Sequence, residues 1–164
     1  AYAVLERLAN SGRIRKGDTL LDYGCGKGRV DCYLSYQTRC HSIGVEYDPR
    51  IYETAAENQK TAVSGGRTEF VLADAGEFPV PGAVNRAYFF NPFSVELLQK
   101  VIRRILDSWY EVSREIRLFF YYPSDEYLAY LMTVDELVFA DEIDCRELFD
   151  GNDARERIVE FVLE

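Results

Sequence analysis

The stretch Leu20-Leu21-Asp22-Tyr23-Gly24-Cys25-Gly26-Lys27-Gly28-Arg29-Val30 is the most informative part of the chain. Its first residues are apolar and predict a buried strand, the glycines predict a turn, and the residues after them predict the start of a helix. Because glycine has no Cβ, such a turn brings bare backbone close to a ligand. The helix start adds N–H groups that have no partner within the helix. The stretch therefore predicts a ligand-binding turn between a strand and a helix.

The glycine spacing separates this turn from that of dinucleotide-binding enzymes. Those enzymes carry G-x-G-x-x-G, whereas the sixth position counted from Gly24 is Arg29 in this chain. The sequence also offers no candidate hydride-transfer site. An NAD-dependent oxidoreductase is therefore not indicated.

Apolar runs alternate with amphipathic stretches along the rest of the chain. Helices are predicted over 2–9, 27–37, 49–63, 94–108 and 124–132, and strands over 19–23, 42–47, 68–73, 86–90, 116–122, 137–149 and 157–163. This alternation implies a mostly parallel sheet that is covered by helices on both faces. The last two strands are joined by the turn 150–153, so they are expected to be antiparallel.

The overall composition fits one globular domain over residues 1–164, with 48 % hydrophobic residues and a net charge of −9. The negative charge disfavours nonspecific capture of nucleic acid or of an anionic membrane. No apolar stretch suggests a membrane span, no signal peptide is visible, and the four cysteines form no C-x-x-C pair or zinc pattern. We expect a cytoplasmic protein with reduced thiols and no metal. The chain begins with Ala1 within a predicted helix, and we expect residues upstream of it.

The glycine turn and the residues after it resemble motif I of the class I S-adenosylmethionine-dependent methyltransferases. The form D-Y-G-x-G-K-G-R is similar to a variant found among uncharacterised bacterial members, and Lys27 is expected to face solvent. The resemblance extends from Thr19 to Leu163. It implies an α/β fold of the Rossmann-like type, a three-layer α/β/α sandwich around a seven-stranded sheet of order 3-2-1-4-5-7-6, with an antiparallel last strand.

The same resemblance implies a set of residues that bind S-adenosyl-L-methionine. Asp22 matches the acid that orients the turn and the amino-acid end of the cofactor, Glu46 the acid that binds the ribose hydroxyls, and Asp74-Ala75 the pair that reads the adenine edge. The full expected cofactor-binding set is Asp22, Gly24, Cys25, Gly26, Gly28, Glu46, Tyr47, Asp74, Ala75 and Asn91. We expect a valine at Gly26 to fill the turn and abolish binding.

The segment Asn91-Pro92-Phe93-Ser94 after the fourth predicted strand resembles motif IV of methyltransferases that act on amino nitrogens. The resemblance makes Asn91, Pro92 and Phe93 the candidate catalytic residues, which position the acceptor without a metal. The segment has one proline where the motif usually has two. A strand-ending turn is an equally good interpretation, and Asn91 is expected to line the pocket under both. Tyr121-Tyr122-Pro123 offers aromatic walls, although ordinary strand packing explains these tyrosines better.

Two functions remain open from the sequence. The first is a methyltransferase whose acceptor is a nitrogen of a protein side chain, a base or a small molecule. The alternative is a noncatalytic subunit or scaffold that keeps the cofactor site. The sequence leaves the acceptor, the pathway and the oligomeric state open, and it predicts no membrane partner.

Overall fold

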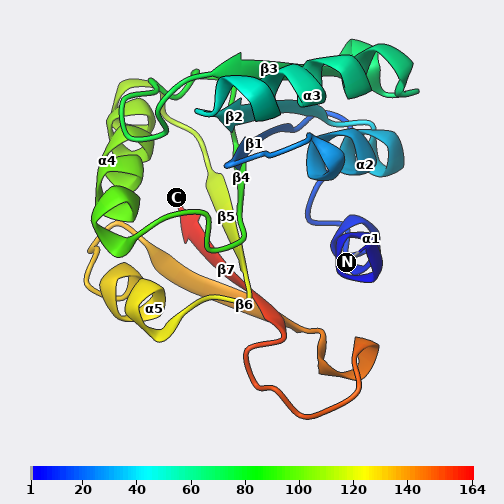
Figure 1. Cartoon of the computed structure of the whole chain (residues 1–164). Helices are drawn as coiled ribbons and strands as arrows, with labels where there is room; N and C mark the ends of the chain where they lie inside the picture. The colour runs from blue at the N-terminus through cyan, green and yellow to red at the C-terminus, as the bar shows by residue number, and fades with distance from the viewer. Residues whose placement is uncertain (1) are drawn as a thin grey trace.

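The computed structural model describes residues 2–164, which form a seven-stranded sheet between two groups of helices (Figure 1). The α-helices are α1 (Tyr2–Asn10), α2 (Arg29–Thr38), α3 (Pro49–Thr61), α4 (Val95–Glu111) and α5 (Asp125–Leu131). The strands are β1 (Thr19–Tyr23), β2 (His41–Glu46), β3 (Thr68–Leu72), β4 (Arg86–Phe89), β5 (Ile116–Tyr121), β6 (Val138–Asp144) and β7 (Arg157–Leu163). Short 3-10 turns occur at η1 (Gly65–Arg67) and η2 (Arg146–Leu148).

The strand order is β3-β2-β1-β4-β5-β7-β6, which confirms the order predicted from the resemblance. Strands β1 to β5 pair in parallel, and β7 is antiparallel to both β5 and β6. The register places Tyr23 opposite Val45 and Glu46 opposite Leu72. The carboxyl ends of the first three strands therefore meet at one edge of the sheet, which is where ligands bind in open parallel sheets.

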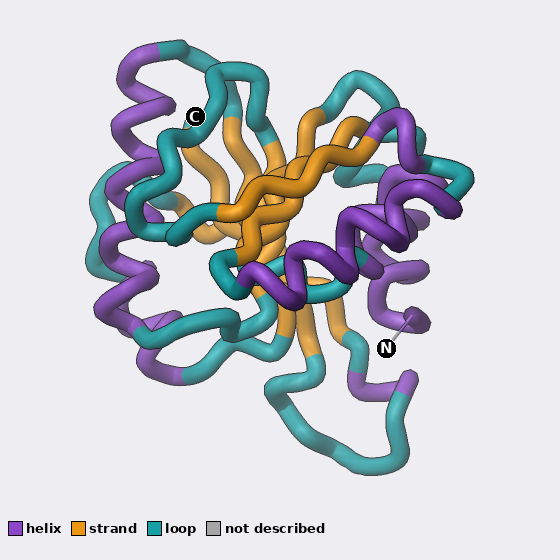
Figure 2. The backbone as a smooth tube through the Cα atoms, turned by 45° about the horizontal axis from the view of Figure 1, so that its top comes forward, coloured by secondary structure: helices purple, strands orange, loops and turns teal. Residues whose placement is uncertain are grey.

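Helices cover both faces of the sheet, as the alternating pattern predicts (Figure 2). On one face α4 buries Leu98, Val101, Ile102 and Ile105 in the same cluster as Phe89. On the other face α1 and α2 bury Leu8 and Leu34 against residues of β1, β4 and β5, and α3 adds Ala55 beside Phe70. Each buried aliphatic side chain contributes about 1.5–3 kcal/mol of transfer free energy, so the two cores fix the sheet between its helices.

The predicted helix starts are confirmed by their caps. The Asp48 carboxylate accepts a hydrogen bond from the Arg50 amide at 2.9 Å, with Pro49 at the first helical position. Ser94 and Ser124 cap α4 and α5 in the same way, each through its hydroxyl at 3.2 Å from an amide three residues later. These caps set where each helix leaves the carboxyl edge of the sheet.

The strand predicted over 137–149 is wrong at its end, because β6 stops at Asp144. The Asp144 carboxylate accepts a hydrogen bond from the Arg146 amide at 2.9 Å and pairs with the Arg146 guanidinium. This local turn competes with the strand ladder and leads into η2. The link to β7 therefore runs from Cys145 to Glu156 instead of being a tight turn at 150–153.

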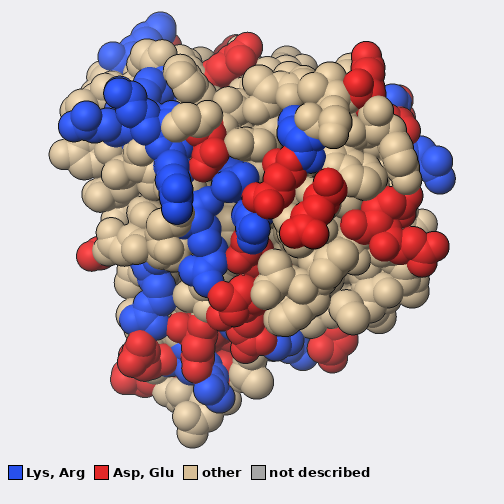
Figure 3. Space-filling view, turned by 180° about the vertical axis from the view of Figure 1, so that it is seen from behind, with Lys and Arg blue, Asp and Glu red and all other residues tan. Residues whose placement is uncertain are grey.

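Ion pairs connect residues near the amino ends of the central strands, at one edge of the sheet. The Glu160 side chain is 2 % exposed, and it accepts hydrogen bonds from Arg13 Nε at 2.8 Å and from an Arg117 terminal nitrogen at 2.6 Å. Arg86 lies 3.6 Å from Asp18 in the same group. Figure 3 shows Lys and Arg gathered on one part of this view, with Asp and Glu interspersed at its lower end. Acidic partners thus neutralise Arg13, Arg86 and Arg117 in this group.

Three further features concern the cysteines, the apolarity of the helices and the groups that could bind a metal. All four cysteines are free thiols. Within residues 2–164 no helix has the length and apolarity that a bilayer crossing requires. The same residues contain no group of three His, Cys, Asp or Glu side chains arranged to hold a metal ion.

Candidate active site

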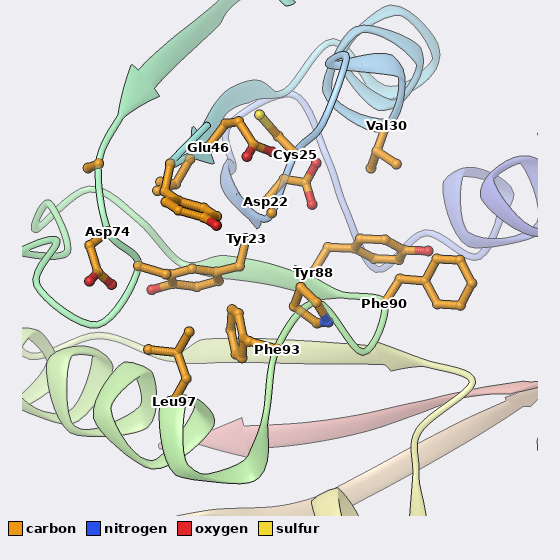
Figure 4. A pocket seen from close by; sticks show the side chains of 16 residues that line it. Asp22, Tyr23, Cys25, Val30, Glu46, Asp74, Tyr88, Phe90, Phe93 and Leu97 are labelled. Atoms are coloured by element: carbon orange, nitrogen blue, oxygen red, sulfur yellow. The ribbon is translucent and has the colours of Figure 1, made fainter. Parts of the chain in front are cut away.

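A cavity of about 530 Å³ opens at the carboxyl ends of β1, β2, β3 and β4. In Figure 4, Asp74 and Phe90 lie at its two ends, and Asp22, Cys25 and Glu46 lie together between them. Its lining is made by Asp22, Tyr23, Gly24, Cys25, Val30, Val45, Glu46, Tyr47, Ala73, Asp74, Ala75, Tyr88, Phe90, Pro92, Phe93 and Leu97. The structure therefore brings together residues that the sequence placed at four separate strand ends.

The glycine turn is held against β2 by its own backbone. The amides of Gly24 and Cys25 both donate to the Val45 carbonyl at 3.0 Å. Gly24, Gly26 and Gly28 have φ values of +68°, +57° and +80°, which other residues adopt only at a conformational cost. The turn thus depends on glycine at three positions, of which Gly24 lines the cavity directly.

The three glycines differ in what surrounds them. A Cβ at Gly24 would lie 2.9 Å from the Pro92 Cβ, and a Cβ at Gly28 would lie 2.5 Å from the Phe70 ring. A Cβ at Gly26 would meet no atom within 4 Å. A Cβ at Gly26 therefore does not clash within the turn, contrary to the expectation that a side chain there fills it. What restricts this position to glycine is its positive φ. Gly28 serves packing against β3 and is not part of the lining.

Glu46, at the end of β2, connects the glycine turn to the start of α3. One carboxylate oxygen accepts from the Gly26 amide at 2.9 Å, and the other accepts from the Asp48 amide at 3.1 Å. The residue is 9 % exposed and lines the cavity. A carboxylate oxygen has two acceptor sites, so each oxygen retains one for a ligand.

Asp22, at the end of β1, is 3 % exposed and lines the cavity floor. Its Oδ2 accepts no hydrogen bond from a donor among residues 2–164, and the carboxyl of Asp31 lies within hydrogen-bonding reach of the Asp22 side chain. Burial raises the pKa of Asp22 to about 7, and the nearby Glu46 carboxylate contributes to the rise. Asp22 therefore changes its charge near neutral pH.

Asp74 and Ala75 lie where β3 leads into the following loop. The Asp74 Oδ1 accepts from the Gly76 amide at 2.9 Å, and the Ala73 amide donates to the Glu46 carbonyl at 3.0 Å. These bonds hold the loop beside the end of β2. Tyr47, which is 76 % exposed, forms part of the lining nearby.

Asn91 does not line the cavity, contrary to expectation. Its side-chain nitrogen donates to the Tyr122 carbonyl, and its Oδ1 accepts from the Ser124 amide at 3.3 Å. Its backbone has a φ of +39°, which Asn tolerates better than most residues. The amide is thus used to join the end of β4 to the turn after β5, which is the strand-ending role considered from the sequence.

The neighbours of Asn91 do face the cavity. Pro92 and Phe93 both line it, and the Phe93 amide donates to the Tyr127 hydroxyl at 3.2 Å. Tyr121 and Tyr122 do not belong to the lining, because their hydroxyls donate to Glu156 and Asp153 on the β6–β7 connection. The packing interpretation of these tyrosines agrees with the structure.

Comparison with known sequences decides the family. The profile of a methyltransferase domain matches residues 20–115, which is more than half of the chain and includes the glycine turn and all three strand-end acids. The chain belongs to this methyltransferase family. The methyltransferase domain is also 27 % identical over 113 residues to 27-O-demethylrifamycin SV methyltransferase from Amycolatopsis mediterranei (strain S699). That match covers 69 % of this chain and 39 % of the relative, so the chain spans about two fifths of that protein's length.

Solved structures share the fold of the methyltransferase domain. An RNA methyltransferase from Salinibacter ruber in complex with S-adenosyl-L-homocysteine has a TM-score of 0.64 at 18 % identity, covering 99 % of this chain and 90 % of that one. The mitomycin 7-O-methyltransferase MmcR has a TM-score of 0.73 at 15 % identity, with 99 % and 53 % covered. A TehB-like S-adenosylmethionine-dependent methyltransferase from Corynebacterium glutamicum has a TM-score of 0.70 at 17 % identity, with 98 % and 87 % covered.

Sequence reasoning missed several residues that line the cavity of the methyltransferase domain. Tyr23 is 1 % exposed, its ring stacks on Phe89 at 5.0 Å, and it points toward Asp74 in Figure 4. Its hydroxyl has no hydrogen-bond partner among the described residues, and burial raises its pKa. Its place directly after Asp22 in motif I is a sequence signal by which Tyr23 could have been found. The other residues missed are Val30, Val45, Ala73, Tyr88, Phe90 and Leu97, for which the sequence shows no comparable signal.

Proposed function

We propose that this methyltransferase domain binds S-adenosyl-L-methionine in the cavity and transfers its methyl group to an acceptor that enters beside Phe90. One observation carries the proposal. Asp22, Glu46 and Asp74 end three adjacent strands and line one cavity together with Gly24. Three carboxylates at the rim of a glycine turn form a site for a ligand that has cationic groups, a diol and an amino-bearing base.

The residues present fit that ligand. Asp22 presents a buried carboxylate oxygen that accepts no hydrogen bond from a donor among residues 2–164, which suits an ammonium or sulfonium. Glu46 retains one acceptor site on each oxygen, which suits a pair of ribose hydroxyls. Asp74 uses Oδ1 for the Gly76 amide and keeps acceptor capacity for an exocyclic amino group. The absence of a Cβ at Gly24 leaves room between the turn and Pro92.

Methyl transfer from a sulfonium depends mainly on the alignment of the acceptor with the methyl group. S-adenosyl-L-methionine, when bound, supplies a methyl group on a sulfonium that needs no metal for activation. The chain's own contribution is to hold the acceptor in line with that methyl, and orientation of this kind accounts for a large part of many rate enhancements. Pro92 and Phe93 form the wall next to Gly24, and Tyr127 fixes the Phe93 backbone. These residues hold the acceptor end of the cavity in place.

For the acceptor we propose a planar molecule that carries an amino nitrogen. Phe90 is 57 % exposed and lines the cavity, so it offers an aromatic face for stacking. Because Asn91 is used in the turn, the nitrogen is recognised through the backbone and the aromatic walls rather than through that amide. A hydroxyl acceptor is the second candidate. It is supported by the mitomycin neighbour, which is named as a 7-O-methyltransferase, and by the relative named 27-O-demethylrifamycin SV methyltransferase.

A transfer assay with the isotope-labelled cofactor tests this function. The purified chain is incubated with labelled S-adenosyl-L-methionine and a panel of planar amines and phenols, and products are separated by liquid chromatography and mass spectrometry. Label on an amine supports the proposed acceptor, and label on a phenol alone supports the second candidate. Cofactor binding without transfer to amines, phenols or cell extract would contradict the enzyme and favour the noncatalytic subunit.

A further inference from the structure

A second buried carboxyl lies beneath Asp22. Asp31 is in the first turn of α2 and is fully buried, at 0 % exposed. Its carboxyl is within hydrogen-bonding reach of the Asp22 carboxyl. Apart from each other, both Asp31 oxygens and Asp22 Oδ2 have no hydrogen-bond partner among residues 2–164. Two buried carboxyls in contact hold at least one proton between them, because two adjacent buried negative charges repel strongly.

The groups around this pair add no positive charge. Glu46 faces it from β2, Cys25 from the glycine turn, Cys32 from α2 and Tyr88 from β4. Each of these groups is neutral or negative at physiological pH. No ion pair within the described residues involves Asp22 or Asp31. A cation that balances the pair must therefore come from the ligand.

We propose that Asp31 is a positioning residue that acts through Asp22: in its protonated form it donates a hydrogen bond to Asp22 and so prepares a carboxylate for the cationic end of the ligand. Binding of a cation is then coupled to the loss of one proton from Asp22. This inference rests on the proposed function, because S-adenosyl-L-methionine is the cationic ligand concerned.

The proton balance follows from the two carboxyls. Without the ligand at acidic pH, both hold a proton and the pair is neutral. When a cation binds, Asp22 releases its proton to solvent and Asp31 keeps the other, which it shares with the Asp22 oxygen. The pair then carries one negative charge opposite the ligand's positive charge. No other group has to change its protonation state.

The direction of the pKa shifts agrees with this assignment. Burial raises the pKa of Asp22 to about 7, while the hydrogen bond from Asp31 acts in the opposite sense and lowers it. Burial and the neighbouring Asp22 raise the pKa of Asp31 well above its ordinary range, so Asp31 is the carboxyl that keeps its proton. A cation prefers the ionised form of Asp22. Ligand affinity should therefore rise with pH up to about 7 and then level off.

Calorimetric titration of the whole chain with S-adenosyl-L-methionine tests the inference. Titrations at or below about pH 6.5, in buffers with different ionisation enthalpies, measure proton release while the ligand's own amino group stays protonated. We expect net release of a proton near pH 6 and a gain in affinity of up to about tenfold per pH unit below the pKa of Asp22. The Asp22→Asn variant should lose both the release and the pH dependence.

Variants of Asp31 separate a positioning role from a purely structural one. In Asp31→Asn the amide still donates to Asp22, so the pH profile should stay close to that of the unmodified chain. In Asp31→Leu the donor is lost, so the midpoint of the profile should move to higher pH and affinity at pH 7 should fall several-fold. Equal pH midpoints in the Asn and Leu variants would overturn the inference, as would binding by the unmodified chain without proton release. Failure of the unmodified chain to bind at any pH would instead overturn the proposed function on which the inference depends.

Discussion

At the scale of single residues, the cavity is defined by acids and glycines that have separate tasks. Glu46 ties the glycine turn to α3 through both of its oxygens. Gly24 leaves the space that Pro92 approaches, while Gly28 leaves the space for the Phe70 ring. A substitution at any of these positions therefore changes stability or ligand affinity through a specific local contact. These effects can be distinguished by experiment.

Replacing Gly24 with Ala should reduce both stability and cofactor affinity. The alanine must adopt a φ of +68° and place its Cβ 2.9 Å from Pro92. We expect a loss of about 1–3 kcal/mol in the free energy of unfolding and at least tenfold weaker cofactor binding. Urea unfolding and calorimetry measure the two effects.

Gly12→Ala is the matched control for this substitution. Gly12 has a φ of +78°, and a Cβ there would meet no atom within 4 Å. It should show the conformational cost alone, with unchanged affinity. Equal affinity in the two variants would contradict the role assigned to Gly24.

Asp22→Asn should change how stability depends on pH. The pKa of Asp22 rises from its ordinary value of 3.8 to about 7 in the folded chain, so the folded state holds this proton more tightly than the unfolded state does. The stabilisation is complete below pH 4 and is lost as pH rises through 7, with an upper bound of about 4 kcal/mol. The variant should therefore gain stability relative to the unmodified chain between pH 5 and pH 8. Unfolding free energies that differ by the same amount at both pH values would contradict the shift.

At the scale of elements, the site depends on ties between neighbouring strand ends. Asn91 joins the end of β4 to the turn that precedes α5, and the Ala73 amide joins β3 to β2. These contacts bring the loops after different strands together at one edge. The acceptor wall at Pro92 and Phe93 is therefore positioned from β5 and α5 as well as from β4.

Asn91→Ala should lower stability while leaving cofactor affinity largely intact. The alanine removes both side-chain hydrogen bonds of the tie, which are exposed, so we expect a loss of about 1 kcal/mol. Transfer to the acceptor should fall more than binding, because the wall next to Pro92 loses its support. Asn152→Ala, in the exposed β6–β7 connection, is the control and should change neither property. A loss of cofactor affinity as large as the loss of transfer would move Asn91 to the cofactor side.

Elements proved easier to predict than contacts between them. The apolar stripe of α4 and the caps at Asp48, Ser94 and Ser124 are local signals, and they confirm the predicted helices. The end of β6 was missed, since the local turn made by Asp144 with Arg146 outweighs the extended pattern there.

Burial and long-range contacts explain the misses within the site. An acid in the first turn of a helix is usually exposed, and only the packing of α2 on the sheet shows that Asp31 is buried. The partner of Asn91 lies 31 residues away in the chain, so its use in the turn has no sequence signal. The acids at the strand ends could be placed because the glycine turn resembles motif I, and this resemblance implies the strand order and the positions of the acids.

At the scale of the whole molecule, the fold concentrates negative charge where a cationic ligand would bind. The chain carries a net charge of −9, and its basic side chains near the amino ends of the strands are largely paired with acids. The three carboxylates of the cavity lie at the opposite, carboxyl edge of the same sheet. The paired Arg13, Arg86 and Arg117 thus lie at one edge of the sheet, while the cavity carboxylates, which form no ion pair within residues 2–164, lie at the other.

The most direct test of this account is calorimetric titration of the folded chain with S-adenosyl-L-homocysteine, repeated on Glu46→Ala and on the exposed control Glu53→Ala. We predict one binding site in the unmodified chain, the same affinity in Glu53→Ala, and at least tenfold weaker binding in Glu46→Ala. A folded, unmodified chain that gives no binding heat at several temperatures, or a Glu46→Ala variant that binds as tightly as the unmodified chain, would contradict the placement of the ligand at these strand ends.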